Sequence, residues 1–529
     1  MSETKTAPFG KLRSLLWPIH GFELKKLIPM LLLMFFINFN YTILRDVKDA
    51  LIVTAPGSGA EAIPFLKVWG VLPVAVLFML GYAKLSNMLS KPKLFYTTIS
   101  VFLGFFAFFA LVLYPARDVL HPTELADRLQ ASLPAGFSGL IAIFRNWTFG
   151  LFYIMSELWG SMALSLLFWG FANDITRISE SKRFYAMFGI GANLAMLPSG
   201  QLIKYFAKSH TDIVGTADAW GSTINSLTIL VMVAGIAVIG VYWWINKNIL
   251  SDPKFYNPAE VKKAKKKPKM PLKESFAFLM KSKYLLCLAL LVIGYGVAIQ
   301  LVEVTWKNQL KLQYPTANEY AAFMGSFSQI TSILTIFMML FVGGNVIRRF
   351  GWGKGALATP IVLLISGIGF FAFVIFKDHL GGLVSALGTT SLMLAVICGT
   401  VQNVLSKSTK YSLFDPTKEM AYIPLDPESK VKGKAAIDVV GARFGKAGGA
   451  LINQGLIVVT GSIALIAPYV AVIMIGILGV WIVAARSLNK QFLSLSAEKE
   501  AEAAAEAAAA EAVEAEAEQE TAKSPQPTS

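Results

Sequence analysis

Charged residues and histidines are scarce in this chain of 529 residues. Asp, Glu, Lys and Arg make up 15% of it, whereas a soluble domain carries about a quarter. The four histidines form no H-E-x-x-H motif, and the two cysteines, Cys287 and Cys398, are too far apart for a zinc-binding pair. These absences exclude a zinc hydrolase and a disulfide-rich secreted domain. We predict no enzymatic activity, no metal ion and no other cofactor.

A phosphate-binding loop is also absent. The segment GARFGKAGG (441–449) is superficially similar to one, but three residues separate Gly441 from Gly445 where four are needed. Ala447 also stands where Ser or Thr would hold magnesium. The small residues of this segment favour a closely packed helix face instead.

Long apolar runs dominate the chain, which is 55% hydrophobic and has a mean hydropathy of +0.57. Runs of about 20 apolar residues are typical of membrane-spanning helices. We predict an all-α polytopic membrane protein with twelve transmembrane helices in two six-helix halves, the layout of the major facilitator transporters. The predicted spans are 27–50, 63–89, 94–115, 138–174, 180–206, 220–246, 285–311, 317–349, 354–376, 382–413, 433–460 and 464–486.

Basic residues gather in every second connection between these spans. Because cytoplasmic loops are rich in Lys and Arg, this pattern predicts that both termini and the central loop are cytoplasmic. The run KKAKKKPK (262–269) could bind acidic lipid, but we interpret it as part of a linker between the halves. The predicted organisation is a cytoplasmic N-terminus (1–26), a first half (27–246), a basic linker (247–284), a second half (285–490) and an acidic Ala/Glu-rich tail that is disordered or helical (491–529).

Several ionisable residues interrupt the apolar spans. Each costs roughly 2.5–3.5 kcal/mol at the bilayer centre, so such residues usually have a function. The cations suit an anion site, because ammonium and guanidinium groups bind phosphate strongly in a cavity of low dielectric constant. The acids could couple binding to a conformational change, and the alternative is that all these charges only pair to hold the helices together. The set comprises Arg45, Asp46, Lys48, Lys67, Glu157, Glu303, Lys307 and Lys446.

Aromatic and amide side chains near these charges could recognise a base or a sugar. Tyr41 precedes Arg45 by about one helical turn, and Asn403 lies inside the tenth predicted span. Either residue could equally pack against, or hydrogen-bond to, neighbouring helices. Together with Lys67, Lys446, Glu157, Glu303, Arg45 and Lys307, they are the candidate substrate-binding residues.

Five long segments carry a close resemblance to the ATP/ADP translocases of obligate intracellular bacteria and plastids, above all the chlamydial ones. It covers roughly residues 10–490, and the acidic tail lies outside it. The segments are FNYTILRDVKDALIVTAPGSGAEAIPFLK (39–67), SELWGSMALSLLFWGFAN (156–173), LVEVTWKNQLKLQYP (301–315), QNVLSKSTKYSLFDPTKEMAYIPLD (402–426) and KGKAAIDVVGARFGKAGGALI (432–452).

This resemblance implies exchange of external ATP for internal ADP across a bacterial inner membrane by alternating access. The family's four important charged positions fall on Lys67, Glu157, Glu303 and Lys446. The expected partners are ATP, ADP, inorganic phosphate and the lipid bilayer, with no nucleic acid, and the expected state is a monomer. One alternative is a transporter of the same fold for another nucleotide or organic anion, with or without proton coupling. A membrane-embedded enzyme is a third class.

Overall fold

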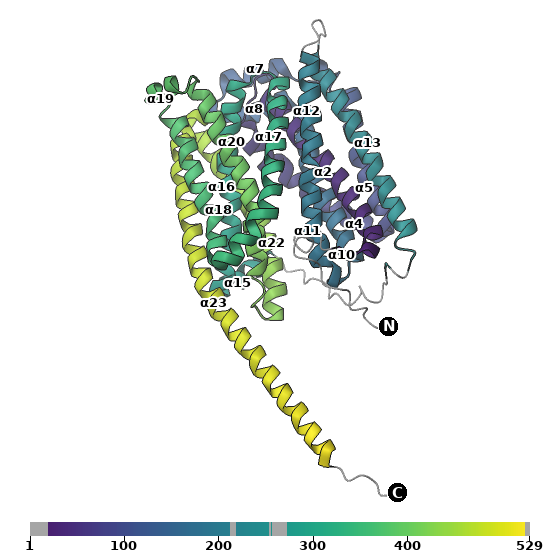
Figure 1. Ribbon diagram of the computed structural model, residues 1–529. Helices are drawn as coiled ribbons and strands as arrows, with labels where there is room; N and C mark the ends of the chain where they lie inside the picture. The colour runs from purple at the N-terminus through teal and green to yellow at the C-terminus, as the bar shows by residue number, and fades with distance from the viewer. Residues whose placement is uncertain (1–18, 212–217, 253–254, 257–271, 524–529) are drawn as a thin grey trace.

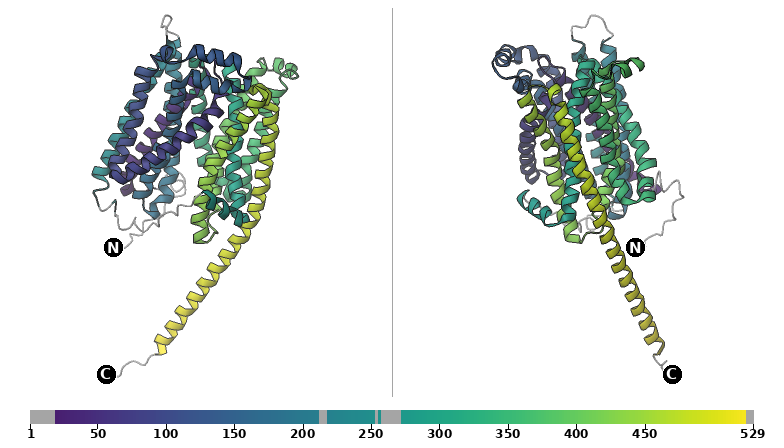
Figure 2. Two further views of the ribbon diagram at one scale, coloured as in Figure 1. Left: turned by 180° about the vertical axis from the view of Figure 1, so that it is seen from behind. Right: turned by 90° about the vertical axis from the view of Figure 1, so that its left-hand side faces the viewer.

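The computed structural model describes residues 19–211, 218–252, 255–256 and 272–523. Within these residues all regular structure is helical, which confirms the predicted fold class. The start of the predicted N-terminal segment (1–18) and the basic run at 262–269 lie outside the described residues. The helices group into two bundles that stand side by side (Figures 1 and 2).

The first bundle runs from η1 to α13. In chain order it contains η1 (Gly21–Glu23), α2 (Leu24–Val53), α3 (Ala62–Phe65), the π-helical η2 (Leu66–Val71), α4 (Leu72–Met88), α5 (Lys91–Phe108), the π-helical η3 (Phe109–Leu113), α6 (Arg117–Leu120), α7 (Thr123–Ser132), η4 (Ala135–Phe137), α8 (Ser138–Arg145), α9 (Trp147–Trp159), the π-helical η5 (Gly160–Phe168), α10 (Trp169–Ile175), α11 (Ile178–Leu194), α12 (Met196–Thr211) and α13 (Ala219–Asn248).

The second bundle begins after the residues that are not described. It contains α15 (Leu272–Lys281), α16 (Lys283–Gln313), α17 (Ala317–Phe337), the π-helical η6 (Met338–Gly343), α18 (Gly344–Ile375), α19 (Gly381–Ala386), α20 (Ser391–Thr409), the π-helical η7 (Lys410–Phe414), α21 (Asp415–Met420), α22 (Pro427–Thr460) and α23 (Ile463–Lys523).

Nine helical segments of the described residues are long and apolar enough to cross a membrane. One of them, Ala317–Ile375, is 59 residues long and contains a turn at Gly351, whose φ of 82° only glycine adopts readily. Two further predicted spans fall on α20 with η7 and on α22, which are helical but are not among these nine segments. The structure is therefore compatible with twelve crossings.

Two predicted spans differ from the observed helices. The prediction for 138–174 is interrupted at Asn146, whose ψ of 44° leaves the helical region between α8 and α9. The amide of Asn146 donates to the carbonyls of Pro56 and Ala142, at 3.0 Å each, and so ties this break to the loop after α2. The prediction for 382–413 is split into α19 and α20, and Thr390 caps the start of α20 by accepting a hydrogen bond from the backbone of Met393.

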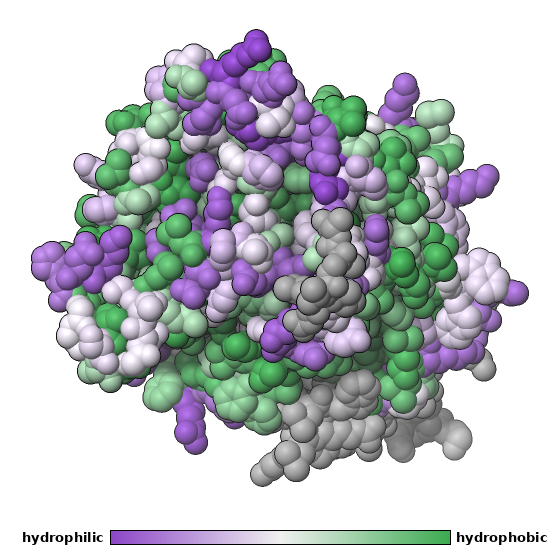
Figure 3. All heavy atoms as spheres, turned by 90° about the horizontal axis from the view of Figure 1, so that it is seen from above, coloured by the Kyte–Doolittle hydropathy of each residue, from purple (hydrophilic) through white to green (hydrophobic). Residues whose placement is uncertain are grey.

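An apolar surface surrounds the bundles along their flanks. α4 has no buried residue at all, and Leu77 and Leu80 on it are each about two-thirds exposed. Ile229 and Val233 on α13 and Val472 on α23 are similarly exposed. Exposed apolar side chains along several helices are expected where lipid covers the protein. Hydrophilic side chains, by contrast, reach across the face seen from above (Figure 3).

The seam between the bundles is tightest where α12 packs on α17. A Cβ on Gly200 would lie 2.5 Å from the carbonyl oxygen of Gly325, and one on Gly325 would lie 2.5 Å from that of Gly200. α22 meets the first bundle at α3, η2 and η4. We call the end with α7 and α8 the upper end and the opposite one the lower end (Figure 1).

The acidic tail continues α23 as a helix to Lys523 and projects away from the lower end (Figures 1 and 2). α2 also begins at the lower end. Both ends of the described chain therefore lie on one side of the protein.

Candidate functional site

α2 carries a charged turn in its upper half, where Arg45 and Asp46 face the second bundle. The guanidinium of Arg45 lies 2.9 Å from Asp46 Oδ1 and donates to Ser328 Oγ on α17 at 2.7 Å. The hydroxyl of Ser328 in turn donates to Asp46 Oδ2 at 2.6 Å. Because Asp46 is fully buried and paired, the charge of Arg45 is already compensated.

Lys48 is buried one turn further along α2. Its ammonium group lies 2.8 Å from Asp49 Oδ1 and 3.0 Å from Glu157 Oε1 on α9. It also stands over the ring of Tyr153, 3.9 Å from the centroid. Lys48 therefore has a carboxylate on each side.

Lys307 on α16 continues this series of pairs across the seam. Its ammonium group lies 2.8 Å from Asp49 Oδ2 and 2.8 Å from Glu303 Oε1. The other oxygen of Glu303 lies 3.4 Å from the ammonium group of Lys67, which also donates to Gln300 Oε1 at 2.6 Å. Lys307 therefore contacts Asp49 of the first bundle, and Lys67 contacts Glu303 and Gln300 of the second. Both lysines thus link the two bundles.

These contacts form one continuous ion-pair ladder. In order its members are Glu157, Lys48, Asp49, Lys307, Glu303 and Lys67. Three carboxylates alternate with three ammonium groups, so the ladder is neutral as a whole. Buried charges are tolerated when each has a partner of opposite sign, and the alternation satisfies that requirement in both bundles at once.

Two π-helical segments adjoin the ladder. Lys67 is the second residue of η2, and η5 begins three residues after Glu157. A π-helical turn inserts an extra residue into a helix and is frequent at functional sites. Here it changes which face of the helix the following residues occupy.

Lys446 on α22 differs from the ladder lysines. Its side chain is exposed, and no carboxylate of the described residues lies within 4.0 Å of it. Gly445, the residue before it, packs against Gly296 on α16, about one turn before Gln300, which places Lys446 beside the ladder. One turn further along α22, Gly449 packs against Gln300, the residue that holds Lys67.

Lys407 on α20 is a second cation without a carboxylate within 4.0 Å in the described part of the chain. Its half-buried ammonium group lies 4.5 Å from the centroid of the Phe327 ring. Lys410, one turn on, is paired with Asp415 at 2.6 Å. Because the ladder and the Arg45–Asp46 pair are neutral, Lys407 and Lys446 each add positive charge near the seam. Lys311 adds a further one, and its ammonium group donates to the backbone carbonyl of Ser58.

The predicted candidates fall into three groups: ladder members, cations beside the ladder, and uncharged residues. The ladder contains Lys67, Glu157, Glu303 and Lys307. Of the cations beside it, Arg45 is paired with Asp46 and Lys446 has no carboxylate partner among the described residues. Tyr41 is half-buried with its ring against Gly160. Asn403 is buried and its amide donates to the carbonyl of Gly399 on its own helix, at 2.8 Å, so its bond does not reach the ladder.

Three residues of this site were named neither among the ionisable residues that interrupt the spans nor among the candidate substrate-binding residues. Asp49 lies in the charged segment of α2, Gln300 one turn before Glu303, and Lys407 one turn after Asn403. Helical spacing was the available signal, since residues three or four positions apart share a face.

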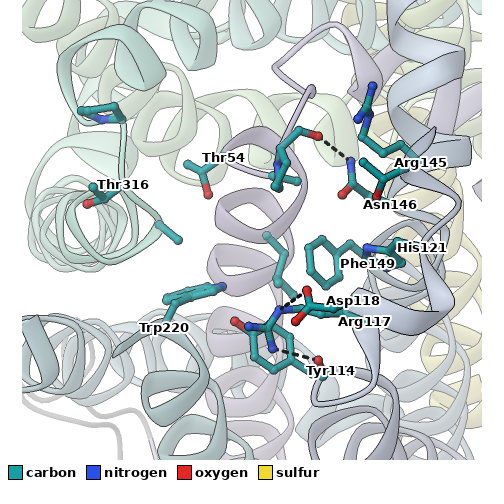
Figure 4. A pocket seen from close by; sticks show the side chains of 16 residues that line it. Thr54, Tyr114, Arg117, Asp118, His121, Arg145, Asn146, Phe149, Trp220 and Thr316 are labelled. Atoms are coloured by element: carbon teal, nitrogen blue, oxygen red, sulfur yellow. Dashed lines mark hydrogen bonds and ion pairs between the residues drawn. The ribbon is translucent and has the colours of Figure 1, made fainter. Parts of the chain in front are cut away.

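A separate cavity of about 240 Å³ lies at the upper end, one turn of α2 beyond Asp49 (Figure 4). Arg117, Arg145 and Trp220 are among its lining residues. Arg117 pairs with Asp218 at 2.9 Å, and Arg145 pairs with Asp127. Since both arginines are compensated, this cavity lacks the free positive charge that an anion site requires.

Comparisons with known proteins identify the family of this chain. Residues 2–492 match the family described as TLC ATP/ADP transporter. The chain is 62% identical over 499 residues to ADP,ATP carrier protein 1 of Chlamydia muridarum, covering 94% of each chain. It is 51% identical to the chloroplastic ADP,ATP carrier protein 2 of Arabidopsis thaliana, covering 90% of this chain and 76% of the relative.

Among solved structures, a bacterial homologue of the iron transporter ferroportin in an inward-facing state is similar in fold. It superposes with a TM-score of 0.53 at 12% identity and covers 89% of this chain and 99% of that one. A Major Facilitator Superfamily transporter in the outward conformation gives a TM-score of 0.43 at 17% identity.

Proposed function

Since the chain belongs to the TLC ATP/ADP transporter family, we propose that it exchanges ATP for ADP across a membrane, with the nucleotide bound between the two bundles. The observation that carries this proposal is the charge distribution at the seam. A neutral ladder crosses it, and Lys446 stands beside the ladder with an exposed, uncompensated ammonium group.

In this proposal Lys446 and Lys67 bind the phosphates, and Arg45 assists. Ammonium groups form strong, charge-assisted hydrogen bonds with phosphate oxygens when water is largely excluded. Lys446 needs no rearrangement to do so. Lys67 must first leave Glu303, and the contact between them, at 3.4 Å, is the longest in the ladder.

Glu157 and Glu303 hold the cations while the site is empty. When phosphate replaces Glu303 as the partner of Lys67, one connection between the bundles is lost. A ligand that removes such a connection changes the relative stability of the two conformations. Substrate binding would thereby permit the bundles to move relative to each other, which is alternating access.

We place this exchange in a bacterial inner membrane, with both termini in the cytoplasm, as the basic connections suggest. External ATP would enter as internal ADP leaves, and inorganic phosphate is a further candidate substrate. We expect the transporting unit to be a monomer, because each monomer contains both bundles and a complete ladder.

The test is exchange by purified protein in liposomes loaded with ADP and supplied with labelled external ATP. We expect Lys446→Ala and Lys67→Ala each to lower uptake by about tenfold or more, since each removes a charge-assisted contact worth about 1.5–3 kcal/mol. Lys91→Ala is the matched control, because Lys91 is 80% exposed and pairs with Asp174 away from the ladder. Normal uptake by both site variants would refute the phosphate assignment.

The same liposomes separate the alternative function. Uptake that needs internal ADP and persists when the proton gradient is collapsed supports nucleotide exchange. Uptake that follows the proton gradient and is insensitive to internal ADP would instead indicate a proton-coupled transporter of the same fold.

A further inference from the structure

The ammonium group of Lys407 contacts an aromatic ring and has no carboxylate within 4.0 Å among the described residues. Its ammonium group faces Phe327 at 4.5 Å, and its side chain keeps partial access to solvent. A contact with an aromatic face compensates a buried cation less than a carboxylate does. The position is thus suited to an anion that arrives from outside the chain.

The neighbours of Lys407 place it beside the Arg45 pair. Phe327 and Ser328 are consecutive residues of α17, and Ser328 accepts a hydrogen bond from Arg45. Two acids, Glu303 and Asp46, and two cations, Arg45 and Lys307, are near enough to interact with the charge of Lys407. Because Arg45 is already neutralised by Asp46, the free charge in this part of the seam belongs to Lys407.

Lys410, the first residue of η7, has the carboxylate partner that Lys407 lacks among the described residues, and this partner is the first residue of α21. The ammonium group of Lys410 contacts Asp415 at 2.6 Å. The two lysines are three residues apart, but among the described residues only Lys410 has a carboxylate partner. This contrast makes Lys410 a matched control for the loss of one positive charge.

We propose that Lys407 is a phosphate-binding residue that acts together with Lys446 to select nucleotides bearing a polyphosphate chain. This rests on the proposed function and adds a residue to it. The two lysines approach the seam from different helices, α20 and α22, so a chain of two or three phosphates could contact both. A single phosphate would satisfy fewer of these charges.

The experiment compares Lys407→Gln, Lys407→Arg and Lys410→Gln in liposomes loaded with ADP. The KM for external ATP is measured, together with inhibition by inorganic tripolyphosphate, which lacks the base and the sugar. For Lys407→Gln we expect both the KM and the half-inhibitory tripolyphosphate concentration to rise about tenfold. Lys407→Arg should recover most of both, and Lys410→Gln should change neither by more than about twofold.

A merely structural role would give a different result. Lys407→Gln would then lower the maximal rate, through less active protein, and leave the KM and the tripolyphosphate inhibition unchanged. That result would overturn the proposal, as would an equal effect of Lys410→Gln.

Binding of tripolyphosphate to Lys407 can also be measured without transport. If the wild-type protein exchanged no ATP, the proposed function would fail. Tripolyphosphate should still raise the unfolding temperature of the purified wild-type protein, and this shift should be lost in Lys407→Gln. Equal shifts in the two proteins would refute the role of Lys407.

Discussion

Asp49 and Lys307 form the central pair of the ladder, and each is about 98–99% buried. Asp49→Asn leaves one positive charge in excess, and Lys307→Met leaves one negative charge. We expect each single variant to lose about 3–5 kcal/mol of stability, because it leaves an uncompensated buried charge. The double variant keeps Lys48 with Glu157 and Lys67 with Glu303. It should therefore recover at least half of that loss, measured by denaturant unfolding in detergent.

A double variant as unstable as the sum of the singles would show that the two residues act independently. A suitable reference is the exposed pair of Lys91 and Asp174, whose single and double variants should all lie within about 1 kcal/mol of the wild type.

The sequence could predict those site residues that place a charge inside an apolar span. Lys67, Glu157, Glu303 and Lys446 stand out because each interrupts an apolar span. They lie on four different helical segments, and only Lys67 and Glu303 contact each other, so no local pattern specifies which acid meets which lysine. Asp49 illustrates the limit, since it bonds lysines of both bundles.

At the scale of elements, the α12–α17 contact depends on two glycines. A Cβ at Gly325 would lie 2.5 Å from a backbone oxygen of Gly200, and neither backbone can move without shifting its helix. We expect Gly325→Leu to lower exchange at least about tenfold and to reduce the unfolding temperature, because overpacking typically costs about 1–3 kcal/mol. Exchange in liposomes and thermal unfolding in detergent measure the two effects.

Gly81→Leu is the control for this substitution. Gly81 lies on α4, and a Cβ there meets nothing within 4 Å. Its exchange rate and unfolding temperature should match the wild type. If both variants behaved alike, close packing at the seam would not limit transport.

The predicted spans match the observed helices where a continuous apolar run alone determines the extent of the helix. The disagreements lie where a predicted span is interrupted at a polar residue such as Asn146 or Thr390. Asn146 ends α8 by hydrogen-bonding to the loop after α2, a contact distant in sequence. The five π-helical segments were not predicted, because they arise from packing rather than from a distinctive composition.

For the whole molecule, one polar contact that joins the two bundles lies toward the upper end. There Thr223 Oγ1 on α13 donates to Asn318 Oδ1 on α17 at 2.9 Å. If exchange requires this end to open, linking the two positions should stop it. We expect Thr223→Cys with Asn318→Cys, in a background of Cys287→Ala and Cys398→Ala, to lose at least about 90% of exchange on reaction with a short bis-thiol cross-linker.

A second cysteine pair within one bundle controls for modification itself. Tyr185→Cys with Asn173→Cys joins α11 to α10, whose side chains are already in contact at 2.6 Å. Cross-linking there should leave most of the exchange intact. Continued exchange after complete cross-linking of the Thr223 and Asn318 positions would show that the upper end need not open.

The neutrality of the ladder has an electrical consequence. Fully ionised ATP carries four negative charges and ADP three, and the fixed charges of the ladder are the same whichever nucleotide is bound. Exchange of these two forms alone would therefore move one net charge across the membrane in each cycle. A potential of 100 mV changes the free energy of that step by about 2.3 kcal/mol. The transmembrane voltage would thus help to set the direction in which such a carrier runs.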